Sequence, residues 1–419
     1  MTTTAEIQAA ARERAFSMPL DEINPADAQL FANDTVGHYF ARLRRDAPVH
    51  RSTSPLFGPY WSVTKYQDIM AVDTNHATYS SDWARGGIVI SDRPMQDRLA
   101  MFIAMDPPKH DVQRLAVSPI VAPQNLANME GLIRERTQKV LDGLPRNETF
   151  NWVEKVSIEL TTLMLATLFD FPLEERRKLT HWSDVATSVP GVDPGAPPLE
   201  KRAAELQQMA AAFAKLWNER VNAPPGPDLI SMLAHNPVTR NMTPLNFMGN
   251  LVLLIVGGND TTRNSISGGV LFLHENPAEF RKLTANPALV ASMVPEIIRY
   301  QTPLAYMRRT ATEDAIVGGK TIKVGDKVAM WYVSGNRDGE VIEAPNEFII
   351  DRKNPRHHLS FGFGIHRCMG NRLAEMQLRV IWEEILKRFR RVEVVGEPVR
   401  VRSSFVKGYD TLPVVLHAL

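Results

Sequence analysis

The stretch LSFGFGIHRCMGNRL, residues 359–373, contains Cys368, the only cysteine among 419 residues. Three glycines, two phenylalanines and a histidine lie in the ten positions from Phe361 to Gly370, and a helical pattern follows. A thiolate is stabilised at a helix N-terminus because backbone N–H groups and the helix dipole favour negative charge there. The position of this cysteine therefore favours a thiolate that binds a metal.

The other residues of the stretch can serve such a ligand. Gly364 and Gly370 let the backbone fold closely around the sulfur, and Phe361 can shield it from water. His366 can hold an anion beside the metal site. This arrangement suits a haem iron ligated by a cysteine thiolate, a ligand that favours O–O cleavage.

Plainer interpretations of the same residues exist. A lone cysteine is commonly a small buried hydrophobe. Gly362-x-Gly364 is half of a dinucleotide-binding loop, but a third glycine at the required distance is missing. A zinc site is a further alternative, although the usual paired ligand spacing is missing; its ligands would be His357, His358, His366 and Cys368.

The pattern Phe361-x-x-Gly364-x-His366-x-Cys368-x-Gly370 closely resembles the haem-binding signature of the cytochrome P450 superfamily. Arginine is also common in that family at the position of His366. The resemblance implies haem b as cofactor, with Cys368 as the axial ligand of the iron.

Composition agrees with a folded enzyme. The chain is 44% hydrophobic and 23% charged, with a net charge of +1, so its charge does not point to nucleic acid. A lone cysteine cannot form an internal disulfide, which favours a reducing, cytoplasmic setting. No apolar run is long enough for a signal peptide or a membrane anchor, and we expect a soluble protein.

Periodicity predicts a mainly α (α+β) protein with small β-sheets. Residues 46–72 read as strand, turn, strand and helix, with the turn at Gly58-Pro59. Alternation predicts strands in 315–338 and at the C-terminus, and helices are expected over 108–146, 150–169, 205–221, 243–274, 288–300 and from 371 onward. The Pro/Gly-rich segment 188–202 is either a mobile lid or a fixed loop.

The helix over 243–274 contains VGGNDTTRN. Two glycines inside a helix cost roughly 1 kcal/mol each relative to alanine, so Gly257 and Gly258 need a reason. One is close helix packing; the other is a widened groove for dioxygen. The stretch resembles the oxygen-activation motif of the family, which implies that Asp260 and Thr261 relay protons.

Two further charged motifs match the family. Glu296 and Arg299 share one helix face, and taken singly this is most often a surface pair. The resemblance implies instead a buried structural network with Arg352, which supports the cysteine loop. It also implies that the haem carboxylates are bound by His110, Arg114, Arg309 and His358, with Arg308 as a rival for Arg309.

The resemblance extends over residues 36–419, after an N-terminal extension of 1–35. It implies one triangular, mainly helical domain over 1–419, with haem between the long central helix and the helix after the cysteine loop. The implied activity is that of a monooxygenase using O2. The sequence contains no flavin domain, iron–sulfur motif or dinucleotide fingerprint, so NAD(P)H electrons would arrive through a separate ferredoxin and ferredoxin reductase. Arg114, Arg367 and Arg372 could receive an acidic carrier.

Several stretches resemble the bacterial subfamily that hydroxylates medium-chain alkanes and fatty acids at the terminal carbon: 80–92, 102–123 and 302–328. The pocket residues implied by family position are mostly apolar, as a hydrocarbon requires. They are Ile88, Val89, Leu253, Val256, Gly257, Leu304, Tyr306 and Phe405. A terpenoid, steroid or aromatic substrate remains an alternative, as do a haem-thiolate sensor and a zinc-binding regulatory protein.

Overall fold

The computed structural model describes residues 4–92, 95, 98–188 and 196–419. Contacts divide the chain into two compact units, each assembled from separate stretches of sequence. The sheet unit contains Met1–Arg98, Pro295–Cys368 and Pro398–Asp410. The helical unit contains Leu99–Val294, Met369–Glu397 and Thr411–Leu419.

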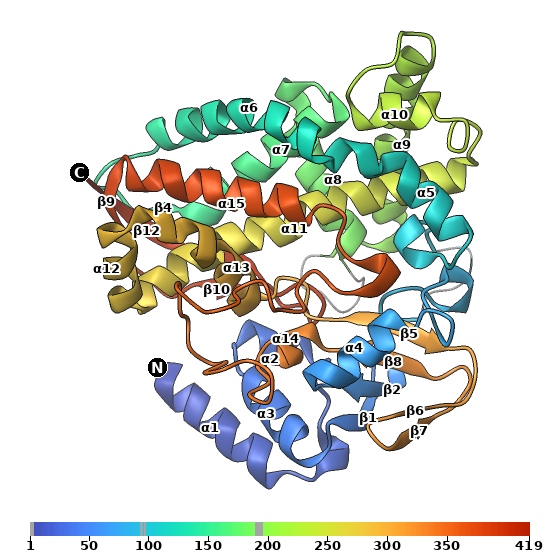
Figure 1. Cartoon of the computed structure of the whole chain (residues 1–419), viewed down its shortest axis with the longest axis vertical. Coiled ribbons are helices and arrows are strands. Elements are labelled where there is room, and N and C mark those ends of the chain that lie inside the picture. The colour runs from blue at the N-terminus through green and yellow to red at the C-terminus, as the bar shows by residue number, and fades with distance from the viewer. Residues whose placement is uncertain (1–3, 93–94, 96–97, 189–195) are drawn as a thin grey trace. The chain divides into compact units, whose positions relative to one another are not determined.

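The helical unit is organised around α11 (Pro244–Glu275), which packs against α7 (Glu159–Phe169), α8 (Arg177–Thr187) and α15 (Asn371–Leu386) (Figure 1). The other helices here are α5 (Lys109–Val117), α6 (Pro123–Asp142), α9 (Leu199–Val221), α10 (Leu229–His235) and α12 (Pro277–Ala285). A small sheet has the order β4-β12-β9, from Phe150–Asn151, Pro413–Ala418 and Phe389–Val394. α13 (Val290–Gln301) contributes residues to both units.

The ends of α11 follow from its sequence. The Thr243 side chain accepts a hydrogen bond from the backbone N–H of Asn246, and Pro244 occupies the first turn, where its missing N–H costs nothing. The helix ends directly before Asn276 and Pro277, because proline cannot continue it. α7 is apolar on nearly all sides and is correspondingly buried, as expected.

The sheet unit contains a mixed sheet of order β1-β2-β8-β5-β3. Its strands are β1 (Val49–Ser54), β2 (Gly58–Val63), β8 (Lys327–Met330), β5 (Met307–Ala311) and β3 (Tyr79–Ser80). Two further pairs are β6 (Ala315–Val317) with β7 (Lys320–Ile322), and β10 (Val399–Arg400) with β11 (Tyr409–Thr411). The helices are α1 (Thr4–Ser17), α2 (Ala28–Ala32), α3 (Val36–Asp46), α4 (Tyr66–Thr74) and α14 (Tyr332–Gly335).

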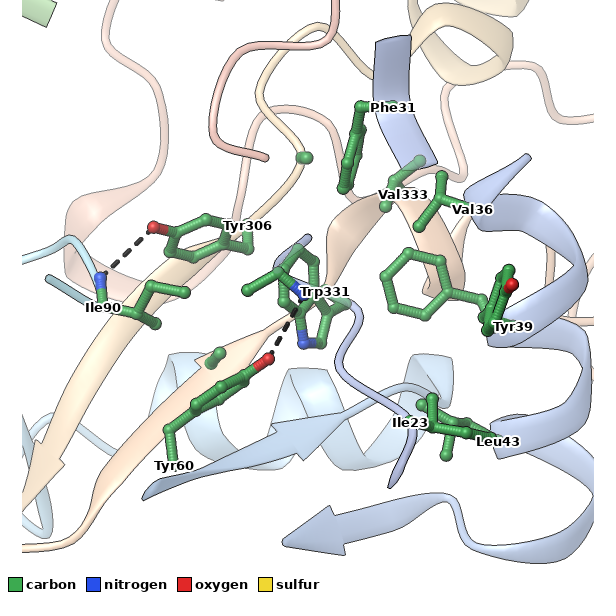
Figure 2. Packing of buried hydrophobic residues seen from close by; sticks show 14 of the residues in the cluster. Ile23, Phe31, Val36, Tyr39, Leu43, Tyr60, Ile90, Tyr306, Trp331 and Val333 are labelled. Atoms are coloured by element: carbon green, nitrogen blue, oxygen red, sulfur yellow. Dashed lines mark hydrogen bonds between the residues drawn. The ribbon is translucent and has the colours of Figure 1, made fainter. Parts of the chain in front are cut away.

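One core of this unit surrounds the fully buried Trp331 (Figure 2). Its ring lies 4.8 Å from that of Tyr306 and 5.1 Å from that of Phe40, between centroids. Helices α2 and α3 supply apolar side chains to this core, as do strands β2 and β8 and the residues Ala305 and Tyr306 directly before β5. The core therefore holds the start of β5, the strand that carries Arg308 and Arg309.

Three expected element boundaries are wrong. The helix over 108–146 is divided into α5, a 3₁₀ turn at Ser118–Val121 and α6, because Pro119 and Pro123 cannot donate helix hydrogen bonds. Gly58 and Pro59 do not form the turn; they begin β2, paired with Ser54 and Thr53. The segment 150–169 starts as strand β4 and continues through a π-helical turn at Val153–Ile158 before α7.

The segment 188–202 is described only in part. Residues 199–202 form the first turn of α9, while 189–195 lie outside the described residues, so the choice between lid and fixed loop stays open. Among the helices that the structure describes, none has the length and apolar character needed to cross a bilayer.

Candidate active site: the cysteine loop and the central helix

The cysteine loop closes on itself through its backbone. The N–H of Cys368 donates to the carbonyl oxygen of Phe361 at 2.7 Å, and Cys368 is an exposed residue. Gly364 has φ +66°, and a Cβ there would lie 2.6 Å from the carbonyl oxygen of Asp73. Only glycine fits this position, so the loop is shaped to present the sulfur outward.

A buried carboxylate holds the loop. The Oδ2 atom of Asp73, in the last turn of α4, accepts from the N–H of Phe363 at 2.8 Å and from the Tyr332 hydroxyl at 2.9 Å. Its Oδ1 accepts from Nη2 of Arg309 at 2.8 Å, within a fully buried ion pair. Burial, reinforced by this carboxylate, raises the pKa of Tyr332. Arg309, one of the residues expected at the haem carboxylates, therefore also anchors the cysteine loop.

Asp73 and Tyr332 were not predicted from the sequence. One signal was available: an anionic side chain in the last turn of a helix is disfavoured by the helix dipole. Such a residue calls for a compensating partner. Its partners lie 236 and 259 residues further along the chain, beyond the reach of local pattern.

The structure brings Glu296, Arg299 and Arg352 together in the same unit. Arg299 donates to both carboxylate oxygens of Glu296 at 2.7 Å, and Nε of Arg352 lies 3.0 Å from Oε2 of the same residue. Arg299 also donates to the carbonyl oxygens of Asn336, Pro345 and Glu347. Both Glu296 and Arg299 are fully buried, so the network joins α13 to the chain that precedes the cysteine loop.

His358 is a neutral, buried imidazole. Burial first, and then nearby Arg299 and Arg367, lower its pKa to about 3. Its Nδ1 accepts from the N–H of Ser360 at 3.2 Å, so the ring proton is on Nε2. That Nε2 is buried and has no hydrogen-bond partner among the described residues. A buried N–H group without an acceptor costs free energy. The site therefore favours a ligand whose carboxylate can accept this hydrogen bond.

In the helical unit, α5 carries His110 and Arg114 one helical turn apart. His110 is buried, and its Nδ1 lies 2.7 Å from Oδ1 of Asp111. Arg114 is half-buried. Both side chains thus lie on α5, as expected. The carboxylate of Asp111 fixes the ring orientation of His110.

The middle of α11 holds the acid and the threonine. Asp260 is buried, and its carboxylate accepts from Nη2 of Arg263 at 2.6 Å and from the Ser183 hydroxyl at 3.1 Å. Burial raises the pKa of Asp260, and Arg263 opposes that shift. Arg263 also contacts Asp184, a half-exposed residue of α8, at 3.1 Å. One guanidinium therefore connects the buried acid with the surface of its unit.

Thr261 is turned differently. Its hydroxyl donates to the carbonyl oxygen of Gly257 at 3.0 Å, across one helical turn. Gly257 is exposed, and nothing described lies within 4 Å of a Cβ built on it. Gly258 does have a packing reason, since its Cβ would lie 2.7 Å from Leu165. Of the two explanations for these glycines, close packing applies to Gly258 and open space to Gly257.

The substrate-pocket candidates divide between the units. Leu253, Val256 and Gly257 share one incompletely buried face of α11. In the sheet unit, backbone contacts join the others: the N–H of Arg308 donates to the carbonyl oxygen of Ile88, that of Ala305 donates to Phe405, and Leu304 bridges Val406. The side chains of Ile88, Val89, Leu304 and Phe405 are half-buried, and Tyr306 is buried.

These residues fit haem better than a bare metal ion. An exposed thiol suits a ligand that must reach iron, and the unpartnered Nε2–H of His358 suits a carboxylate. Gly370, like Gly257, has open space where a Cβ would stand, so no described neighbour demands glycine there. The described histidines, cysteine and carboxylates form no group of three or more that could hold a metal, as the zinc alternative requires.

Comparisons with known proteins agree. The family model for Cytochrome P450 matches residues 199–401. Linalool 8-monooxygenase of Pseudomonas putida is 34% identical over 92% of this chain and 97% of that protein. Methyl-branched lipid omega-hydroxylase of Mycobacterium bovis is 31% identical over 94% of each. The solved structure of Cytochrome P450-153 from Novosphingobium aromaticivorans matches with a TM-score of 0.88 and 46% identity, over 94% of this chain and 99% of that one. The chain therefore belongs to the cytochrome P450 family and is a haem-dependent monooxygenase.

Proposed function

We propose that this monooxygenase hydroxylates the terminal carbon of medium-chain n-alkanes or fatty acids. The observation that carries the proposal is the character of the pocket candidates. Apart from the buried phenol of Tyr306 and the backbone of Gly257, they present half-buried aliphatic or aromatic surface from α11 and from the segments at 88–89, 304 and 405. Such a lining favours a hydrocarbon chain over a polar substrate.

The roles proposed for the chain follow from its geometry. Cys368 would hold the haem, with His110, Arg114, Arg309 and His358 at its carboxylates. When bound, the haem supplies the dioxygen activation that an unreactive C–H bond requires. Asp260 would relay protons, while Arg263 would hold its carboxylate and tie it to the half-exposed Asp184. Burial raises the pKa of Asp260, which favours a carboxyl group that can hold a proton.

Terminal attack requires positioning. Internal C–H bonds are weaker than those of a methyl group, so the pocket must hold the chain end at the reacting centre. The relative from Mycobacterium bovis is named an omega-hydroxylase of a methyl-branched lipid, which supports the same regiochemistry here. The Pseudomonas relative, named for linalool, favours a terpenoid as the second candidate substrate.

A direct competition separates these substrates. Purified enzyme, supplied with a ferredoxin, its reductase and NAD(P)H, is offered dodecane, dodecanoate and linalool. We expect the terminal alcohol of the alkane or of the fatty acid as the main product. Faster turnover of linalool, or mostly internal alcohols from both linear substrates, contradicts the proposal.

Electron delivery by a separate ferredoxin is part of the proposal. Arg367 and Arg372 are exposed and Arg114 is half-buried, so all three can meet an acidic surface. Charge reversal at Arg367 and Arg372 is expected to lower the rate of haem reduction by the ferredoxin, while reduction by dithionite stays unchanged. Equal ferredoxin-driven rates in both proteins would remove these residues from the docking surface.

A further inference from the structure

Strand β5 presents two different faces. Side chains alternate along a strand, so Arg308 and Thr310 point one way and Arg309 the other, while Tyr306 lies directly before the strand. Arg309 donates to Asp73, which holds the cysteine loop. The side chains of the opposite face contact the segment 85–92, which follows β3 along the edge of β5. This segment includes the pocket candidates Ile88 and Val89.

Thr310 of that opposite face and Tyr306, directly before the strand, both bind the 85–92 segment. The hydroxyl of Thr310 donates to the carbonyl oxygen of Arg85 at 2.9 Å, and the hydroxyl of Tyr306 accepts from the N–H of Ile90 at 3.2 Å. The second contact is drawn as a dashed line in Figure 2. The segment is therefore held at Arg85 by β5 and at Ile90 by the residue before β5.

Arg308 makes the central contacts. Its backbone N–H donates to the carbonyl oxygen of Ile88 at 2.8 Å, and its Nη1 to that of Val89 at 3.2 Å. Nη2 donates to the carbonyl oxygen of Arg85 at 3.3 Å, and Nη1 also to Oδ1 of Asp92 at 2.7 Å. One side chain thus gathers the beginning, middle and end of the segment, a task that the planar fork of arginine permits and lysine does not.

Gly86 makes room for this guanidinium. A Cβ at position 86 would lie 2.2 Å from Nη2 of Arg308, and the backbone there has φ +115°. Both the space and the conformation demand glycine. The segment is therefore built around the Arg308 side chain.

The charge of Arg308 is balanced at the edge of the site. Its side chain is only 3% exposed, while that of its partner Asp92 is 56% exposed and is shared with Lys327 at 2.8 Å. Burial lowers the pKa of Arg308, and the Asp92 carboxylate opposes that shift. Removal of Asp92 would leave a buried cation with only neutral partners, the carbonyl oxygens and the Thr310 hydroxyl.

We propose that Arg308 is a positioning residue for substrate selection, because it fixes the segment that carries Ile88 and Val89. The link to regiochemistry rests on the proposed function; the anchoring itself does not. When the anchor is lost, the two side chains no longer hold one position, and the chain end of a linear substrate is less well confined.

The test combines amide hydrogen exchange with product analysis in the haem-loaded enzyme. The variants are Arg308→Lys, Gly86→Ala and the milder Asp92→Asn, and the control is Lys323→Gln, which breaks the exposed Lys323–Asp314 pair of the same unit. A preserved reduced carbon monoxide spectrum shows that a variant is folded. We expect exchange in peptides covering 85–92 to rise about tenfold or more in Arg308→Lys and Gly86→Ala, and less in Asp92→Asn. Lys323→Gln should match the wild type.

Products supply the second readout. The ratio of terminal to internal alcohol from dodecane or dodecanoate should fall about fivefold or more in Arg308→Lys and Gly86→Ala. Unchanged exchange in both variants overturns the anchoring role, whichever substrate the enzyme takes. Faster exchange with an unchanged product ratio overturns the role in selection. Should neither linear substrate be oxidised by the wild type, the proposed function fails, and the product ratio is then measured on linalool.

Discussion

Asp260 lies buried in the middle of α11, yet a single side chain connects it to the surface of its unit. Arg263 contacts both Asp260 and the half-exposed Asp184, and Ser183 donates to the same buried carboxylate. The hydroxyl of Thr261, the next residue, donates to the carbonyl oxygen of Gly257. We propose that the acid and the threonine have two different tasks, supply of a proton and its delivery.

Replacement of Thr261 tests that division. Thr261→Ala removes the hydroxyl without disturbing a packed core, so the reduced carbon monoxide spectrum should be retained. Positioned proton transfer contributes about 10²–10⁴-fold, and we expect coupled product formation to fall at least about tenfold while peroxide accumulates. The comparison is with Thr261→Ser, which keeps the hydroxyl and should keep the coupling. Full coupling in Thr261→Ala would exclude a relay role.

His358 gives a prediction about pH. Its pKa is about 3 in the folded protein against an ordinary value of 6.5, so the unfolded chain binds this proton more readily. The haem-free protein should therefore lose stability as the pH falls from about 6.5 toward 3, by up to about 1.4 kcal/mol per pH unit from this group. Urea unfolding of wild type and His358→Gln at several pH values measures this contribution.

The wild type should lose more stability on acidification than His358→Gln does. The exposed His181 provides the control, since His181→Gln should follow the wild-type profile. Parallel profiles for the wild type and His358→Gln would mean that His358 is not held neutral by burial.

Among the elements, α13 carries the structural network. Glu296 accepts from Arg299, from Arg352 and from the backbone N–H of Ile349 at 2.9 Å. Removal of one partner from a buried ion pair leaves the other charge uncompensated, which typically costs about 3–5 kcal/mol. We expect Glu296→Gln to lower the free energy of unfolding by about that amount, as measured by urea denaturation.

A surface ion pair supplies the control. Glu175 and Lys178 form an exposed i,i+3 pair, and exposed pairs contribute only about 0–1 kcal/mol. Glu175→Gln should therefore change stability little. A loss in Glu296→Gln no greater than that in Glu175→Gln would contradict a structural role for the network.

Elements with strong local signals were predicted well. The cap at Thr243, the proline at 244 and the proline at 277 delimit α11 from nearby residues alone. The division of 108–146 was missed although Pro119 and Pro123 mark it, because helical periodicity on both sides outweighed them. Local sequence therefore determines most elements, and here the two prolines predict the helix boundary better than the helical periodicity around them.

Pairings between distant residues could not be predicted in this way. Arg308 and Asp92 are 216 residues apart, and Arg309 and Asp73 are 236 apart. Neither carboxylate belongs to a motif, and adjacent arginines do not reveal that they serve opposite faces of a strand. The choice between Arg308 and Arg309 depended on the alternation of β5, which becomes informative only when the neighbours of that strand are known.

At the scale of the whole molecule, the family and the fold were predicted from the cysteine stretch and the order of the other motifs, and comparison confirms both. Family membership also brings the cofactor: haem iron, with O2 as co-substrate and electrons that derive from NAD(P)H through redox partners. In the sheet unit, the Asp73 carboxylate and the glycine at 364 shape the loop that bears Cys368, and the Glu296 network holds the chain ahead of that loop. The central claim is that this loop exists to present a thiolate to haem iron.

The most direct measurement is the absorption spectrum of the reduced, haem-loaded protein under carbon monoxide. Thiolate ligation predicts a Soret band at about 450 nm in the wild type and the loss of that band in Cys368→Ala. Since Cys368 is the only cysteine, no other thiolate can replace it. A wild-type protein that binds haem without this band, or a Cys368→Ala variant that keeps it, would contradict the account.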